Sequence, residues 1–137
     1  MNIQQPNKHY QQDHSIVFSC QYHVVFCPKY RRKVLVDGID IRLKELILKK
    51  QEDYGYKIID MEVMPDHVHL LIDVDPRPGV VKIVGQIKGY TAHMLRKEFP
   101  SLKSRLPSLW TRRKFISTVG TVSLEVVKRY IENQKGV

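Results

Sequence analysis

Two histidines and one tyrosine are the residues of this chain with the clearest chemistry. His67 and His69 are separated by a single residue. Alternate residues of a strand point to the same face, so both imidazoles project together, and this geometry suits one divalent cation. Tyr130 and Gln134 are four residues apart, which places a hydroxyl and an amide on one face of a helix. A metal site beside a hydroxyl nucleophile indicates phosphodiester chemistry.

The ligand types favour Mg²⁺ or Mn²⁺. Imidazole nitrogens, an amide oxygen and a substrate phosphate oxygen suit these ions, and imidazole favours Mn²⁺ over Mg²⁺. Zinc needs a fourth protein ligand or water, and neither cysteine, Cys20 or Cys27, lies beside the histidines in sequence. The spacing alone is weak, since histidines in a strand can also face solvent or be hydrogen-bonded within the sheet.

A nuclease built on carboxylates is an alternative interpretation. Acidic residues surround the histidine pair in sequence, namely Asp60, Glu62, Asp66, Asp73 and Asp75. On a regular strand Asp66 points away from its neighbour His67, so it becomes a ligand only if the turn twists it inward.

These residues must be positioned by strands and helices, which the hydrophobic pattern predicts. Alternating apolar residues predict strands over residues 15–26, 56–63 and 67–74, and the last two form a hairpin. In the second strand, Ile59, Met61 and Val63 are expected on one face. Helical spacing predicts helices over residues 39–53 and 80–99. A basic loop follows Pro100, then a short strand over residues 114–119, a break at Gly120, and a last helix with Ser123 as its N-cap.

The order of elements is therefore β-α-β-β-α-β with an additional C-terminal helix. Two split βαβ units around an antiparallel sheet predict an α+β, ferredoxin-like fold. Residues 1–13 are polar and lack a signal-peptide core, so we expect a flexible lead-in followed by one domain over residues 14–137.

The charge balance favours a polyanionic partner. The chain of 137 residues has 23 Lys and Arg against 14 Asp and Glu, a net charge of +9. The best candidate patch for DNA is the run Lys29, Tyr30, Arg31, Arg32 and Lys33, where cations meet phosphates and a ring offers a stacking platform. Arg112, Arg113 and Lys114, beside Trp110, form a second candidate. A solvated loop is the alternative for each.

Composition also bears on the compartment. No apolar run approaches the roughly 20 residues of a membrane span. Cys20 and Cys27 would face opposite sides of one strand and could not form a disulfide. Two free thiols without a signal peptide predict a cytoplasmic protein.

The stretch from Tyr22 to Gln134 resembles the HUH-type single-tyrosine transposases of insertion sequences, of the IS200-like type. The matching segments occur in the expected order, and they are Tyr22-His23-Val24-Val25-Phe26, Pro28-Lys29-Tyr30-Arg31, Met61 to Leu71, Leu109-Trp110, Thr118-Val119-Gly120 and Tyr130 to Gln134. One departure is Lys114, where related sequences often carry an aromatic residue. His23 belongs to the matching stretch, and we expect a structural or DNA-contact role for it.

The resemblance implies a function as well as a fold. It implies that His67 and His69 are the HUH metal ligands, Gln134 the third ligand and Tyr130 the nucleophile. It further implies an enzyme that cleaves and rejoins single-stranded DNA near hairpins at insertion-sequence ends, through a 5′-phosphotyrosine intermediate. A homodimer is implied too, in which the tyrosine helix can complete the partner's site. Independently, one nucleophile per chain and two DNA ends to transfer favour two chains.

Two alternatives remain open from the sequence. A domesticated relative would process repetitive palindromes without moving an element. A non-catalytic ferredoxin-like domain would bind nucleic acid only, because sheets of this kind often bind RNA.

Overall fold

The computed structural model describes residues 11–12, 16–119, 124–134 and 136. Its elements in chain order are β1 (Gln11–Gln12), β2 (Val17–Phe18), β3 (Gln21–Phe26), the 3₁₀ turn η1 (Lys29–Arg31), α1 (Ile39–Lys49), α2 (Gln51–Tyr54), β4 (Tyr56–Met64), β5 (His67–Val74), α3 (Val80–Glu98), α4 (Pro100–Arg105), β6 (Phe115–Thr118) and α5 (Leu124–Glu132). The predicted β-α-β-β-α-β order with a further helix is confirmed.

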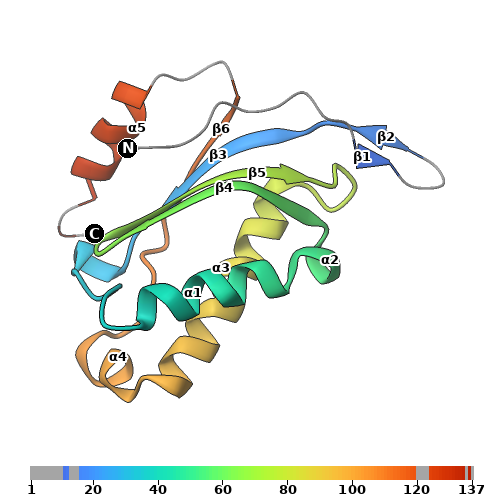
Figure 1. The fold of residues 1–137 in the computed structure, drawn as a ribbon. Coiled ribbons are helices and arrows are strands. Elements are labelled where there is room, and N and C mark those ends of the chain that lie inside the picture. Colours follow the sequence, from blue (N-terminus) through green and yellow to red (C-terminus); the bar gives the residue numbers. More distant parts are fainter. Residues whose placement is uncertain (1–10, 13–15, 120–123, 135, 137) are drawn as a thin grey trace.

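The sheet has four antiparallel strands in the order β4-β5-β3-β6, the arrangement of the ferredoxin-like fold. Helices α1 and α3 lie on one side of this sheet, and α5 lies on the other (Figure 1). We call the first side the core face and the second the α5 face. Of the helices in the described ranges, none combines the length and apolarity needed to cross a membrane.

The core face carries the main hydrophobic core. Strand residues at alternating positions pack against the buried stripes of α1 and α3, and they include Val24, Phe26, Leu70 and Ile72 against Leu43, Ile47, Ile83 and Ile87. Trp110 belongs to this core: its ring meets Phe26 edge-on at 4.7 Å, and its indole N–H donates to Thr91 Oγ1 at 3.1 Å. The Trp110 ring, beside the second candidate DNA patch, is only 6% exposed and belongs to the core.

The strand predicted over residues 15–26 is divided in the structure. Val17–Phe18 pairs with Gln11–Gln12, and Ser19 and Cys20 separate it from β3. The carboxylate of Asp73 accepts the Cys20 backbone N–H at 3.0 Å, which ties this connection to β5. Gln11 and Gln12, expected in the flexible lead-in, are thus a short strand, and the rest of residues 1–13 lies outside the described residues. Neither Cys20 nor Cys27 forms a disulfide.

Three smaller differences have simple physical causes. A bulge between Ile58 and Asp60 shifts the pairing of β4, so Ile58 rather than Ile59 packs with Met61 and Val63 on the core face. The helix predicted over residues 39–53 ends at Lys49 and resumes as α2. Pro100 begins α4 where a loop was expected, because proline fits the first turn of a helix. The predicted break at Gly120 and cap at Ser123 lie outside the described residues.

Candidate active site

The two motif histidines share the α5 face. In the β3–β5 register His69 lies opposite Val25, and directly opposed residues of antiparallel strands project to the same side. Val25 packs with Val127 and Ile131 of α5, so His69 and, two residues earlier, His67 lie on the side that α5 covers. The prediction that both imidazoles point the same way is consistent with this register.

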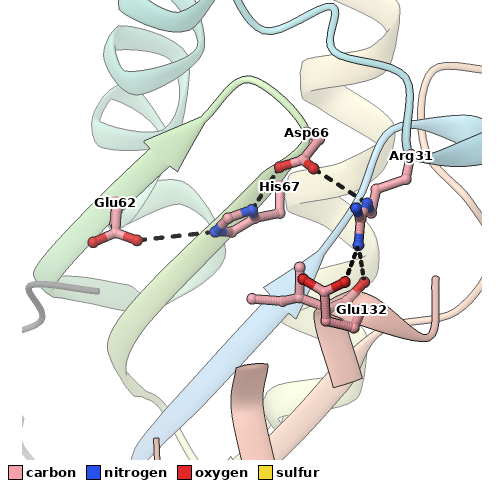
Figure 2. Close-up of polar contacts among 6 residues, drawn as sticks. Arg31, Glu62, Asp66, His67 and Glu132 are labelled. Atoms are coloured by element: carbon pink, nitrogen blue, oxygen red, sulfur yellow. Dashed lines mark hydrogen bonds and ion pairs between the residues drawn. The ribbon is translucent and has the colours of Figure 1, made fainter. Parts of the chain in front are cut away.

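His67 is oriented by the preceding residue. Its Nδ1 lies 2.8 Å from Asp66 Oδ1, in the turn between β4 and β5 (Figure 2). A carboxylate only accepts hydrogen bonds, so Nδ1 carries the proton and Nε2 keeps its lone pair. Glu62 Oε1 is 3.9 Å from Nε2, too far for a hydrogen bond. A histidine held in this way by a carboxylate presents Nε2 as a metal ligand.

His69 is fully buried and meets a third histidine. Its Nε2 lies 3.1 Å from His23 Nδ1, with the two ring centroids 5.3 Å apart. Burial, together with the neighbouring His23 and His67, lowers the pKa of His69 to about 4, so this imidazole is neutral at physiological pH. A neutral imidazole is the form that binds metals. The structural role considered for His23 is therefore contact with His69.

Helix α5 brings Tyr130 to the α5 face of the sheet. Val127 and Ile131 anchor the helix on Val25, and the Tyr130 ring lies 5.1 Å from that of Phe115, which is opposite Val25 in β6. Gln134, just beyond the helix end, is 2% exposed. Burial raises the pKa of Tyr130 to about 12, with Arg113 acting in the opposite direction. The phenol therefore stays protonated and needs activation to attack.

Three buried polar atoms on this face are unsatisfied. Within the described residues, His67 Nε2, Tyr130 Oη and Gln134 Oε1 have no hydrogen-bond partner. Such atoms are costly to bury unless another group meets them. Two are the acceptor atoms expected of metal ligands and the third is the expected nucleophile, so these residues fit a divalent cation and a phosphate. In the described ranges no three His, Cys, Asp or Glu side chains form a metal-binding cluster, and the candidate ligand set contains an amide instead.

The acidic residues do not form a second metal site. Asp66 is engaged by His67 and by Arg31, whose Nε is 3.1 Å from Oδ2, and Asp75 pairs with Arg77 at 2.7 Å. Asp73 lies at the other end of β5 from His67 and accepts the Cys20 backbone N–H. The turn does twist Asp66 inward, but toward a histidine nitrogen and an arginine. The carboxylate-nuclease interpretation therefore has no support in the structure.

The candidate DNA patches are only partly surface-exposed. In the first patch Tyr30, Arg32 and Lys33 are exposed, and Lys29 Nζ lies over the Tyr30 ring at 5.3 Å. Arg31 is different, because its side chain is only 10% exposed and its guanidinium points inward. In the second patch Arg112 and Arg113 are exposed, whereas Lys114 is half-buried. Arg31 is thus a correction to the predicted surface cations.

Sequence reasoning missed the contact of His23 with His69 and the contact of Arg31 with Asp66, the residue that holds His67. His23 shares the α5 face by strand parity once β3 is paired with β5, but that pairing is not visible in the sequence alone. Arg31 sits in a basic run whose composition indicates a solvated loop. Only the tertiary arrangement distinguishes it from Arg32.

Comparisons with known proteins identify relatives of this chain. The family model described as "Transposase IS200 like" matches residues 16–134. The chain is 36% identical to the ISDra2 transposase TnpA of Deinococcus radiodurans over 120 residues, which are 86% of each protein. It is 30% identical to the transposase for insertion sequence element IS200 of Salmonella typhimurium over 119 residues, which are 85% of this chain and 78% of that one.

Solved structures show the same fold. A crystal structure of a Deinococcus radiodurans protein described as a transposase superposes with a TM-score of 0.83 at 31% identity, covering 93% of this chain and 99% of that chain. A REP-associated tyrosine transposase bound to a REP hairpin superposes with a TM-score of 0.57 at 14% identity, covering 95% and 69%. At that identity the second likeness concerns the fold alone.

Proposed function

The chain belongs to the IS200-like transposase family, and from this premise we propose that it cleaves and rejoins single-stranded DNA at the ends of an insertion sequence. The reaction passes through a covalent 5′-phosphotyrosine on Tyr130 and uses Mg²⁺ or Mn²⁺. One observation carries the proposal: His67 Nε2, Gln134 Oε1 and Tyr130 Oη are buried without hydrogen-bond partners among the described residues, on elements that meet at one face of the sheet.

The sheet would supply two of the metal ligands, and α5 with the residues just after it would supply the nucleophile and the third ligand. A divalent cation, when bound, supplies Lewis-acid polarisation of the scissile phosphate. His67 and His69 from β5, with Gln134 beyond α5, are the residues that would hold it. The Nε2 atom of His69 is hydrogen-bonded to His23, so coordination through this nitrogen replaces that bond. Asp66 keeps the proton of His67 on Nδ1 and so keeps Nε2 available.

Tyr130 performs the covalent step. Its Oη attacks the phosphorus and gives up its proton to solvent, the bond from phosphorus to the 3′ oxygen breaks, and the leaving strand takes up a proton from solvent as a free 3′-hydroxyl. The phosphodiester to Tyr130 retains the bond energy, so a 3′-hydroxyl of another strand can reverse the step without ATP. Because burial raises the pKa of Tyr130 to about 12, activation of the hydroxyl relies on positive charge near it, which Arg113 supplies.

We assign substrate binding to exposed cations near this face. Lys29, Tyr30, Arg32 and Lys33 form one surface and Arg112 and Arg113 another, with Lys114 at its edge. Cations meet the phosphates, and the exposed Tyr30 ring offers a stacking surface for a base. The hairpin-bound structure of a protein with the same fold supports DNA hairpins as the substrate shape.

The decisive experiment is an adduct assay. Single-stranded DNA labelled at its 3′ end and carrying hairpins from the flanks of the gene is incubated with the protein and Mg²⁺ or Mn²⁺, then run on a denaturing gel. We expect a label that stays with the protein, and its loss with EDTA or with His67→Ala. Binding without an adduct under any metal would favour the alternative of a non-catalytic binding domain. Cleavage of dispersed palindromes but not of element ends would favour a domesticated relative.

Oligomeric state is tested by mixing. In this structure α5 lies on the sheet of its own chain, and we propose a homodimer because two DNA ends need two nucleophiles. Tyr130→Phe and His67→Ala chains are each expected to be inactive. Recovery of the adduct in their mixture would show that α5 acts on the partner's histidines, and inactivity of the mixture would show that each chain uses its own.

A further inference from the structure

Arg31 differs from its neighbours Arg32 and Lys33 because its side chain is largely buried. Its side chain is 10% exposed, while the neighbouring Arg32 and Lys33 are exposed. A guanidinium that is buried and engaged by protein acceptors cannot serve as a free phosphate contact. Burial of an arginine is costly unless its N–H groups are paired, so its partners indicate its role.

The partners come from two separate elements of the site. Nε lies 3.1 Å from Asp66 Oδ2 in the β4–β5 turn. Nη1 donates to the Ile131 carbonyl at 2.9 Å and lies 3.7 Å from Glu132 Oε2, both at the end of α5 (Figure 2). The planar guanidinium of arginine holds two acceptors in fixed directions at the same time, whereas the ammonium group of lysine imposes no such directions. Arg31 therefore bridges the histidine turn and the tyrosine helix.

Each end of this bridge adjoins a reactive group. Asp66 uses its other oxygen, Oδ1, to hold His67 Nδ1. Ile131 follows Tyr130 directly, and its carbonyl also accepts the Gln134 backbone N–H at 3.1 Å. The positive charge lies at the C-terminal end of α5, where it interacts favourably with the helix dipole. One side chain thus contacts both the support of a metal ligand and the backbone between the nucleophile and Gln134.

The loop that carries Arg31 is itself fixed. Tyr30 and Arg31 both have left-handed backbone, with φ of 60° and 51°, an unfavourable conformation for residues with a side chain. The loop is tied to its surroundings by hydrogen bonds from Lys29 N–H to the Leu109 carbonyl at 2.8 Å and from Arg31 N–H to the Pro28 carbonyl at 2.8 Å. Two strained residues held in this way indicate that the direction of the Arg31 side chain matters.

The apolar cluster that holds α5 on the sheet is small in the part of the chain that the structure describes. Its buried apolar contacts in the described residues come from Val127 and Ile131 on Val25, with Phe115 and Tyr130 alongside. Such a small cluster gives limited hydrophobic stabilisation and no fixed direction. A directional contact at the C-terminal end of α5 would set how far Tyr130 lies from the histidines.

We propose that Arg31 is a positioning residue that couples the placement of the Tyr130 helix to the orientation of His67. One guanidinium holds the Ile131 carbonyl and the Asp66 carboxylate together, so the nucleophile helix and the ligand turn keep one relative position. Its effects on the reaction and on metal binding rest on the proposed function, whereas its effect on α5 does not.

The test compares Arg31→Gln and Arg31→Lys with Arg32→Gln, a matched loss of an exposed charge in the same loop. Hydrogen exchange of the α5 amides is measured in metal-free protein without DNA, and Mn²⁺ binding is measured by calorimetry. Both Arg31 variants should speed α5 exchange at least about tenfold and weaken Mn²⁺ binding by about 10–100-fold. Arg32→Gln should leave both unchanged and instead weaken single-stranded DNA binding, with a lower salt slope.

A third readout is the rate of adduct formation at saturating DNA. Displacement of a reacting group by about 1 Å can lower a rate about 100-fold, and this is the loss expected for both Arg31 variants. If Arg31→Lys retained wild-type exchange and Mn²⁺ affinity, positive charge alone would suffice and the proposal would be overturned. It would also be overturned if exchange rose equally in α3, since that would mean general destabilisation. If wild-type protein formed no adduct but the exchange pattern held, the proposed function would fail and the positioning role would stand.

Discussion

The two faces of the sheet are built for different purposes. The core face is covered by α1 and α3 over a broad buried cluster of strand and helix side chains. The α5 face has three buried apolar residues among those described, Val25, Val127 and Ile131, and the buried polar atoms of the candidate site. Stability is therefore concentrated on one face and chemistry on the other. The site can include buried polar groups without hydrogen-bond partners because the hydrophobic core on the opposite face supplies most of the stability of the fold.

The largest expected effect is loss of activity without loss of stability when the nucleophile on the α5 face is removed. Tyr130→Phe should abolish the covalent adduct completely. The free energy of unfolding should change by less than about 0.5 kcal/mol, because the lost hydroxyl has no hydrogen-bond partner among the described residues. The adduct gel and urea unfolding measure the two quantities. A variant that still formed the adduct would remove Tyr130 as the nucleophile.

Truncations of buried apolar residues compare the two faces directly. Leu70→Ala on the core face should cost about 2–5 kcal/mol of global stability. Val127→Ala on α5 removes two methyl groups and should cost about 1.6 kcal/mol at roughly 0.8 kcal/mol for each. Its effect should appear mainly as faster exchange in α5. Equal losses of global stability in both variants would show that the two faces unfold as one equally packed unit.

The pH dependence of stability reports the buried histidine of the α5 face. Burial lowers the pKa of His69 to about 4. Between this value and the ordinary histidine pKa, His69 is therefore protonated in the unfolded chain and neutral in the folded chain. Its contribution is complete above the ordinary histidine pKa of about 6.5 and is lost as the pH falls toward 4. Urea midpoints in EDTA should therefore decline between these pH values, and His69→Gln should decline less. His93→Gln, which changes an exposed histidine on α3, is the control. Parallel declines for His69→Gln and wild type would contradict the assignment.

The smallest effect concerns surface charge. Lys33→Gln should weaken single-stranded DNA binding modestly and lower the salt slope by about 0.7, the value for one phosphate contact on a single strand. Lys44→Gln, an equal loss of charge on exposed α1 beyond the core face, should leave the slope unchanged. Titrations at several salt concentrations measure both. Equal salt slopes in the two variants would mean that DNA binding does not distinguish the basic loop from the exposed surface of α1.

Sequence periodicity was sufficient for the sheet and the long helices. Apolar alternation locates β5, and helical spacing locates α3 to within one residue of its observed end at Glu98. The same alternation indicates that His67 and His69 share a face. These features are local, because the side chains that reveal them belong to one element.

The missed features depend on residues distant in the chain. Arg31 contacts Ile131, one hundred positions away, and Trp110 finds its partner on α3. Neither contact leaves a periodic signal in sequence. The bulge in β4 was also not predicted, because the alternation rule assumes regular pairing along the whole strand. Composition indicated the basic loop, but only packing shows that one of its arginines faces inward.

The pairing of β5 with β3 has a consequence for changes in chain length. A residue gained or lost inside β5 would turn His67 or His69 toward α1 and α3. The cluster on that side consists of hydrophobic side chains, so an imidazole buried there would lose its hydrogen bonds. Such a chain would fail to fold before its catalysis could be tested. In a cell, a frame-preserving insertion here would be seen as missing protein removed by proteases, whereas a substitution of Tyr130 would be seen as abundant but inert protein.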